Sequence, residues 1–272
     1  MNITFIGGGN MARALIGGLI ARGYASEGLG VVEINPEARG SVAARFGVAT
    51  FSAIEPAALA NAEVIVLAVK PQDVRAVTRE IAGVLKRQIV LTIAAGIRLT
   101  DLSRWLLGYR RLVRAMPNTA ALVGAGIAGL YALPGVDAEG RTRAAAVLEA
   151  VGGVLWCERE EDLDAITAVS GSGPAYVFYF LEALERAAQE LGFSPADARR
   201  LSLATFSGSI RLAEQSDSEP AVLRAQVTSK GGTTERAIAM LDAASVQNAI
   251  VSAVRAAAER AREMGERFGE EH

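Results

Sequence analysis

The sequence is poor in the side chains that most enzymes use for acid–base or metal chemistry. Its only histidine is the last residue, His272, and its only cysteine is Cys157. Because catalytic triads and most zinc sites need these residues, the sequence argues against both, and we expect no metal site. A single cysteine also excludes an intramolecular disulfide. Any reaction at this protein must therefore need little acid–base assistance.

The sequence also lacks an excess of either charge and any long apolar run. It holds 28 basic and 30 acidic residues, with no basic cluster that would attract a nucleic acid. Its apolar runs, such as residues 64–69, are too short to span a bilayer, and no basic segment precedes the first of them. We therefore expect a cytoplasmic protein with a small-molecule ligand and no nucleic-acid or membrane partner.

Strand and helix patterns alternate through the first part of the chain. The predicted strands are residues 2–6, 31–34, 64–68, 88–93, 112–116, 126–131 and 153–156, and the predicted helices are residues 11–22, 36–46, 73–85 and 138–151. Continuously apolar strands are typical of a parallel sheet that is covered on both faces. We predict an α/β fold in which residues 1–160 form an N-terminal Rossmann-type, doubly wound parallel sheet.

The composition changes after residue 160, where alanine-rich and leucine-rich helical patterns replace the strands. Ser194 and Pro195 are typical of a helix start. The last predicted helix, residues 245–268, repeats apolar side chains at spacings of three and four. We predict that residues 161–272 form an all-helical domain. The residues alone leave open whether the last helix covers its own domain or a partner subunit.

A glycine-rich turn directly follows the first strand and leads into a helix. Its residues are Ile6, Gly7, Gly8, Gly9, Asn10 and Met11. Glycines at this place allow a tight turn and a close approach of the backbone to a pyrophosphate, which the helix N-terminus also attracts. The turn therefore predicts a dinucleotide site.

Other residues at strand ends belong to the same predicted crevice, since ligands bind at the carboxyl ends of strands in open α/β sheets. Glu33 lies where a carboxylate binds the adenosine ribose, which favours NADH, although it could also simply face solvent. The remaining candidates, some of which could equally be plain turns, are Ala68, Val69, Lys70, Pro71, Ala94, Ala95 and Asn118. We leave the choice between NADPH and NADH open.

A second glycine-containing segment precedes a helix near the end of the chain. Residues 227–234 include Ser229, Gly231, Gly232, Thr233 and Thr234. Hydroxyl groups and free N–H groups at a helix N-terminus suit a substrate carboxylate. Ordinary helix capping by Thr233 or Thr234 would explain the same residues.

These segments together resemble the pyrroline-5-carboxylate reductase family. The loop at 227–237 looks like the family signature, and further similar motifs follow the family's order at residues 5–12, 69–72, 93–97, 114–119 and 168–176. The resemblance therefore spans nearly the whole chain. Lys230 departs from it, because many members carry proline at this position.

The resemblance implies NADPH-dependent or NADH-dependent reduction of the imine of 1-pyrroline-5-carboxylate to L-proline. A cyclic imine can enter already protonated, which fits the scarcity of acid–base residues. The resemblance implies that Thr234 contacts the ring nitrogen and that Ser229, Gly231, Gly232 and Thr233 hold the carboxylate. It also implies that the helical domain forms a homodimer that assembles to a decamer. We expect helices of the partner to complete each active site.

Two other interpretations fit a Rossmann domain that precedes a helical one. A β-hydroxyacid dehydrogenase uses a helical lysine, and the segment from Pro174 to Glu190 contains none. A nucleotide sensor without turnover would not need the intact loop of hydroxyl residues, although only an assay excludes it.

Overall fold

The computed structural model describes residues 1–270, so His272 lies outside it, and it divides the chain into two compact units. The sheet unit comprises residues 1–172 together with the C-terminal residues from 256, and the helical unit comprises residues 173–255. This division by packing falls after residue 172. The boundary of functional domains that we expect at residue 160 stays a prediction.

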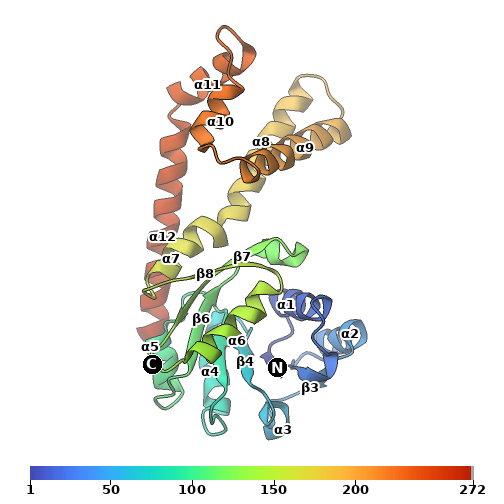
Figure 1. The fold of residues 1–272 in the computed structure, drawn as a ribbon, viewed down its shortest axis with the longest axis vertical. Coiled ribbons are helices and arrows are strands. Elements are labelled where there is room, and N and C mark those ends of the chain that lie inside the picture. Colours follow the sequence, from blue (N-terminus) through green and yellow to red (C-terminus); the bar gives the residue numbers. More distant parts are fainter. Residues whose placement is uncertain (271–272) are drawn as a thin grey trace. The chain divides into compact units, whose positions relative to one another are not determined.

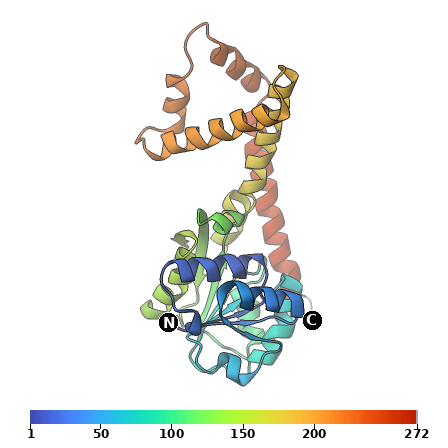
Figure 2. The same cartoon turned by 90° about the vertical axis from the view of Figure 1, so that its right-hand side faces the viewer.

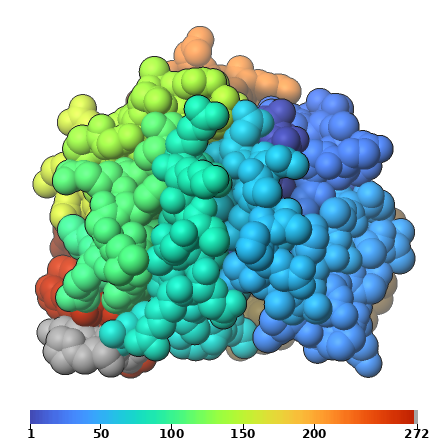
Figure 3. Space-filling view, turned by 90° about the horizontal axis from the view of Figure 1, so that it is seen from below, coloured from blue at the N-terminus to red at the C-terminus, as the bar shows by residue number. Residues whose placement is uncertain are grey.

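The sheet unit contains one eight-stranded sheet in the order β3-β2-β1-β4-β5-β6-β7-β8. Its strands are β1 (Ile3–Ile6), β2 (Leu29–Val32), β3 (Ala49–Phe51), β4 (Val64–Leu67), β5 (Ile89–Thr92), β6 (Leu112–Met116), β7 (Gly126–Ala132) and β8 (Gly152–Trp156). The chain reverses its direction across the sheet between β1 and β4, which makes these two neighbours the topological switch point. Figure 3 shows the surface of this unit from below, with earlier segments in blue on the right and later segments in green on the left.

One pair of strands departs from the all-parallel sheet that the sequence predicts. β6 and β7 are antiparallel, with Ala115 opposite Leu130, whereas every other pair is parallel. The connection between them is residues 117–125, which hold only the 3₁₀ helix η2 (Thr119–Val123). A parallel crossover needs a dozen or more residues, so this short connection returns the chain in the opposite direction.

Helices cover both faces of the sheet, which explains its continuously apolar strands. Along β1, Phe5 packs into a cluster with residues of α1 (Asn10–Ala21), α2 (Pro36–Phe46) and α6 (Ala138–Glu149), whereas Ile6 packs into a second cluster on the other face. That second cluster includes residues of α3 (Pro56–Leu59), α4 (Pro71–Ile81) and α5 (Leu99–Trp105). α1 and α2 lie side by side in both views (Figures 1 and 2). The doubly wound fold is confirmed.

The end of the sheet unit is built from a short helix and a π-helical turn. α7 (Asp162–Ile166) contacts β6 and β7, and the π-helical turn η3 (Thr167–Gly171) follows it directly. The last turns of α12 (Val246–Glu270) return to this unit. There the Arg104 guanidinium donates to the carbonyl of Gly269 at 2.8 Å, and Gly96 lies against Phe268.

The helical unit holds α8 (Gly173–Glu190), α9 (Pro195–Glu214), α10 (Pro220–Gln226), α11 (Thr233–Ala243) and the first part of α12. Ser194 caps α9 as the sequence predicts, accepting a bond from the N–H of Asp197 at 3.1 Å. α8 and α9 pack against each other as a helical hairpin. No strand occurs in this unit.

None of the helices within residues 1–270 is by itself both long and apolar enough to cross a membrane. The pair formed by residues 233–243 and 246–269, bent by 50°, meets the length and composition requirements together.

Candidate active site

The glycine turn lies at the switch point of the sheet, between the ends of β1, β2 and β4. The N–H of Gly7 donates to the carbonyl of Val32 at 2.8 Å, and the N–H of Ala68 donates to the carbonyl of Ile6 at 2.8 Å. Gly7 has a φ of +101°, and a side chain there would place its Cβ 2.6 Å from the Ala68 oxygen. Only glycine fits this position, so the tight turn requires Gly7.

The N-terminus of α1 is open toward solvent. Gly9 caps the helix without a side-chain hydrogen bond, and no acidic residue occupies the first turn. Gly9 and Asn10 are exposed, and nothing lies within 4 Å of a Cβ built at Gly9. Unpaired N–H groups and the positive end of the helix dipole are thus accessible to an anion, so these residues fit the pyrophosphate of a dinucleotide.

Glu33 is bonded to the glycine turn and does not simply face solvent. Its Oε2 accepts a hydrogen bond from the N–H of Gly8 at 2.8 Å, and its Oε1 accepts one from the N–H of Asn35 at 2.8 Å. The carboxylate therefore holds the end of β2 beside the glycine turn. Its role toward the ribose stays a prediction.

Two arginines beside this carboxylate were missed in the sequence. Arg13 donates from Nε to the carbonyl of Gly8 at 2.9 Å, and Arg39 donates from Nη1 to the carbonyl of Glu33 at 3.0 Å. Both lie inside helices, α1 and α2, so no residue next to the glycines or to Glu33 marks them. The only signal in the sequence was that each arginine lies about one turn into its helix, on the side of the chain that follows a strand end.

The end of β4 combines a contact with the glycine turn and a helix start. The atoms nearest to a Cβ built at Gly7 belong to Ala68 and Val69. Lys70 is exposed and is the N-cap residue of α4, and Pro71 is the first residue of that helix. The turn expected here on local grounds is present. The backbone also brings residues 68–71 to the same edge as the glycine turn.

The remaining predicted strand-end residues follow β5 and β6. Ala94 is buried, with its N–H 3.3 Å from the Thr92 hydroxyl, and Ala95 is half-buried. The Oδ1 atom of Asn118 accepts a bond from the N–H of Ile127 at 3.2 Å. The Asn118 oxygen thus holds the connection to β7, which leaves its amide NH₂ for a ligand.

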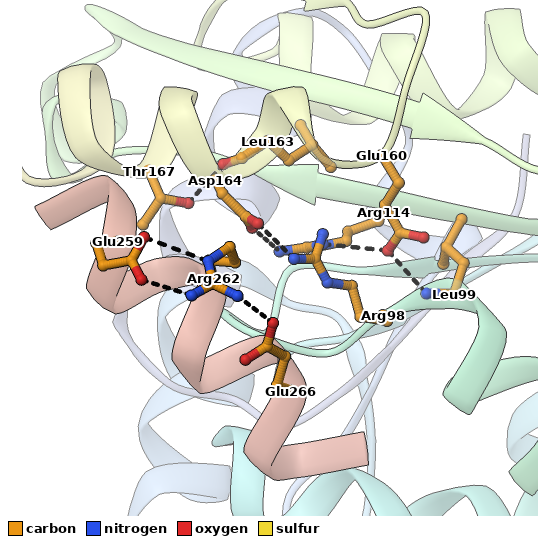
Figure 4. Close-up of polar contacts among 10 residues, drawn as sticks. All are labelled: Arg98, Leu99, Arg114, Glu160, Leu163, Asp164, Thr167, Glu259, Arg262 and Glu266. Carbon is orange, nitrogen blue, oxygen red and sulfur yellow. Dashed lines mark hydrogen bonds and ion pairs between the residues drawn. The ribbon is translucent and has the colours of Figure 1, made fainter. Parts of the chain in front are cut away.

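A buried ion network behind this edge was also missed in the sequence. Arg114, on β6, is 2% exposed and pairs with Glu160 at 3.1 Å and with Asp164 at 3.3 Å. Arg98 also binds Asp164, and the N–H of Leu99 donates to Glu160 at 2.8 Å. Figure 4 shows the four charged side chains converging between α5, α7 and β6, with the exposed ion pairs of Arg262 on α12 nearby. An arginine inside an apolar strand was the signal for this network.

The loop before α11 presents hydroxyl and N–H groups at a helix N-terminus. Gly232 is the N-cap residue, and Thr233 and Thr234 are the first two residues of the helix. Capping by either threonine is therefore not what forms this turn. Among the described residues, no hydrogen bond involves the hydroxyl groups of Ser229, Thr233 or Thr234.

Bonds within the loop hold it in shape. The N–H of Gly232 donates to the carbonyl of Ser229 at 3.0 Å, and the N–H of Gly231 donates to Glu235 at 2.7 Å. Gly231 has a φ of +73°, and a Cβ at Gly232 would lie 2.9 Å from the Ser229 hydroxyl oxygen. The positive φ favours glycine at position 231, and the close contact leaves little room for a side chain at position 232. The resulting turn can accept a carboxylate.

Comparisons with known proteins agree with both halves of this description. Residues 160–264 match the family model "Pyrroline-5-carboxylate reductase dimerisation", and residues 2–96 match "NADP oxidoreductase coenzyme F420-dependent". The chain is 43% identical to the pyrroline-5-carboxylate reductase of Pseudomonas aeruginosa over 98% of both chains. It is 40% identical to that of Haemophilus influenzae over 96% of this chain and 97% of the relative.

Solved structures give the same result. The pyrroline-5-carboxylate reductase of Coxiella burnetii superposes with a TM-score of 0.91 at 39% identity, covering 97% of this chain and 98% of that one. The Plasmodium falciparum pyrroline carboxylate reductase, solved with NADP bound, superposes with a TM-score of 0.87 at 26% identity over the same shares. This chain, with its glycine turn, its hydroxyl-bearing loop and its dimerisation region, belongs to the pyrroline-5-carboxylate reductase family.

Proposed function

We propose that the protein reduces the imine of 1-pyrroline-5-carboxylate to L-proline with NADPH or NADH, the last step of proline synthesis. The observation that carries this proposal is the loop at 227–234, whose Gly232 cap leaves the hydroxyl groups of Thr233 and Thr234 at a helix N-terminus. Its support is the full-length identity to reductases of this name.

The nucleotide would be held along the carboxyl edge of the sheet. Residues 6–11 would bind its pyrophosphate through the open N-terminus of α1, and Glu33 would bind the adenosine ribose. Residues 68–71, 94–95 and 118 would line the remainder of the crevice. When bound, the nicotinamide supplies a hydride, and the protein residues supply binding and orientation.

The substrate carboxylate would be held by Ser229, Gly231, Gly232 and Thr233. The helix dipole of α11 and the free N–H groups of its first turn favour a negative charge there. Thr234, one residue further into the helix, would accept a hydrogen bond from the protonated ring nitrogen through its hydroxyl oxygen. A protonated imine becomes a neutral amine on reduction, so a hydroxyl suffices and no general acid is required. Positioning then supplies most of the catalysis.

The dimerisation region makes this chain part of an oligomer. We propose the finer arrangement of a homodimer that assembles to a decamer, in which the helices of a partner subunit complete each active site. A cytoplasmic location, and the absence of nucleic-acid and membrane partners, stay predictions from composition.

The test is nucleotide oxidation with 1-pyrroline-5-carboxylate and, in parallel, with a 3-keto acid of similar size. We expect turnover with the imine alone. Turnover with the keto acid alone would favour a hydroxyacid dehydrogenase, and nucleotide binding without turnover of either would favour a sensor.

A further inference from the structure

We infer that this protein selects NADH over NADPH and that the Glu33 carboxylate is the group that makes the selection. This inference deepens the proposed function and rests on it. It concerns only the adenosine end of the nucleotide, because NADPH differs from NADH by a phosphate on the adenosine 2′-hydroxyl.

The Glu33 carboxylate is held in place by the backbone. Glu33 accepts two backbone hydrogen bonds, one at each oxygen, from Gly8 and Asn35, both at 2.8 Å. A Cβ at Gly8 would lie 3.3 Å from Oε2, so glycine at this position lets the carboxylate come close to the phosphate-binding turn. Moving the side chain aside would break both bonds. Each oxygen keeps a second lone pair, which can accept a bond from a ribose hydroxyl.

The charge of Glu33 distinguishes the two nucleotides. A carboxylate at the end of the second strand, beside the glycine turn, is placed to bind the ribose 2′-hydroxyl. A 2′-phosphate at that place brings nearly two negative charges against a carboxylate that two backbone hydrogen bonds hold in place. The same fixed group thus favours the hydroxyl of NADH and opposes the phosphate of NADPH.

Two nearby arginines, which could otherwise bind the phosphate, are bonded to other groups of the protein. Nη1 of Arg39 is bonded to the carbonyls of Glu33 and Ile34, at 3.0 and 3.4 Å. Arg13 is bonded to Gly8, Ala38 and Ser41. Ile34, which follows Glu33, is 80% exposed and carries no charge. These guanidinium groups are bonded to carbonyls and a hydroxyl, and among the described residues neither forms an ion pair with the Glu33 carboxylate.

The experiment is isothermal titration of the full-length protein with ADP-ribose and with 2′-phospho-ADP-ribose. We expect ADP-ribose to bind at least about tenfold more tightly, and we expect Glu33→Gln to reduce this ratio to within about threefold. The control is Glu27→Gln, which makes the same charge change at an exposed residue before the amino end of β2. It should leave the ratio unchanged.

Ionic strength provides a measurement that needs no variant. Repulsion between the carboxylate and the 2′-phosphate is screened as salt rises, because the Debye length falls from about 30 Å at 0.01 M to about 3 Å at 1 M. The preference of the wild-type protein should therefore narrow with salt. Equal affinities for the two probes at low salt, or an unchanged ratio in a folded Glu33→Gln variant, would overturn the inference.

These titrations contain no imine. A loss of imine turnover with an intact preference for ADP-ribose would therefore contradict the proposed function and leave the role of Glu33 standing. Imine turnover at equal efficiency with NADH and NADPH would support the proposed function and contradict the role of Glu33.

Discussion

The two units of this molecule bury their apolar side chains to very different extents. The sheet unit has a buried cluster on each face of its sheet. In the helical unit only Ala198 and Ser202 are buried among residues 173–255. Large apolar side chains there stay exposed, among them Phe178 at 58% and Ile210 at 59%. The sheet unit contains its own hydrophobic core, whereas the helical unit leaves most of its apolar side chains exposed.

This difference explains how a dimerisation region is encoded. Helices in water are stabilised mainly by packing an apolar face, and a helical hairpin alone leaves that face in solvent. Exposed apolar patches of this kind mark interfaces between proteins. The folded state of the helical unit should therefore depend on a second subunit, whereas that of the sheet unit should not.

Disrupting the proposed subunit contact should have the largest effect on oligomeric state and on activity. In the double variant Phe178→Asp, Ile210→Asp, two charges lie on the exposed apolar faces of α8 and α9. Burying unpaired charges against a partner costs several kcal/mol each, so we expect monomers and a loss of imine reduction of at least about 100-fold. Sedimentation and turnover measure the two effects.

The matched control is Leu107→Asp, because Leu107 is 82% exposed but lies in the sheet unit. We expect this variant to keep both the oligomer and the activity. A double variant that is monomeric and fully active would show that the helices of a partner are not needed at the active site.

The buried ion network should account for the next largest effect, confined to the sheet unit. Arg114→Met leaves Glu160 and Asp164 without their shared partner, and all three are at most 10% exposed. Removing one partner of a buried pair typically costs about 3–5 kcal/mol, so the free energy of unfolding should fall by that amount. Denaturant unfolding of this variant measures the loss.

The control for the ion network is Arg159→Met. Arg159 pairs with Asp162 at 2.7 Å, but its side chain is 73% exposed. An exposed pair contributes about 1 kcal/mol or less, so unfolding should change little. Equal losses in the two variants would mean that burial of the network adds nothing to the stability of the sheet unit.

Thr234→Ala should separate function from stability in the helical unit. Its hydroxyl has no protein partner among the described residues, so its removal should leave thermal unfolding unchanged. Loss of a hydrogen bond to a charged ring nitrogen should lower kcat/KM for the imine by about 10-fold to 100-fold. Affinity for the nucleotide should stay at the wild-type value.

Thr228→Ala serves as the comparison, since that hydroxyl already donates to the carbonyl of Arg224 at 2.7 Å. It should destabilise the protein slightly and leave kcat/KM within about threefold. An unchanged kcat/KM in Thr234→Ala would remove Thr234 from the catalytic residues.

Much of the sheet unit was predictable because its signals are local. The helix at Pro36–Phe46 and the strand at Leu112–Met116 have the predicted bounds, since a proline start defines the helix and an apolar run interrupted only by Arg114 defines the strand. The short elements β3, α3 and α5 were missed. α5 begins at Leu99, and its N-cap residue Arg98 makes no side-chain cap; β3 has only three residues, too few for a pattern.

The rest could not be predicted, because it depends on residues that are distant in the sequence. Glu160 and Asp164 lie 46 and 50 positions from Arg114, and no periodicity pairs them. The bond between Glu33 and Gly8 spans 25 positions and needs β1 and β2 to be adjacent first. Glycine turns and helix caps can be predicted from neighbouring residues, whereas the side-chain bonds that hold them depend on which strands and helices the topology brings together.

The smallest expected effect is a dependence on alkaline pH that belongs to the sheet unit alone. Tyr109 donates its hydroxyl hydrogen bond to the carbonyl of Gln88 at 2.6 Å, and burial raises the pKa of this tyrosine from 10.0 to about 12. The native state therefore keeps a proton that the unfolded state loses first. The resulting stabilisation is complete below about pH 10 and is lost as the pH rises toward 12.

Tyr109→Phe should therefore be less stable than the wild-type protein by about 1 kcal/mol at neutral pH, because the Gln88 carbonyl loses its donor. Between about pH 10 and 12 the gap should close, since only the wild-type protein has this proton to lose. Tyr179→Phe, in the helical unit and 72% exposed, should follow the wild-type protein throughout. Urea unfolding at neutral pH and again between about pH 10 and 12 measures this difference in stability. A constant gap would mean that Tyr109 does not couple proton loss to unfolding of the sheet unit.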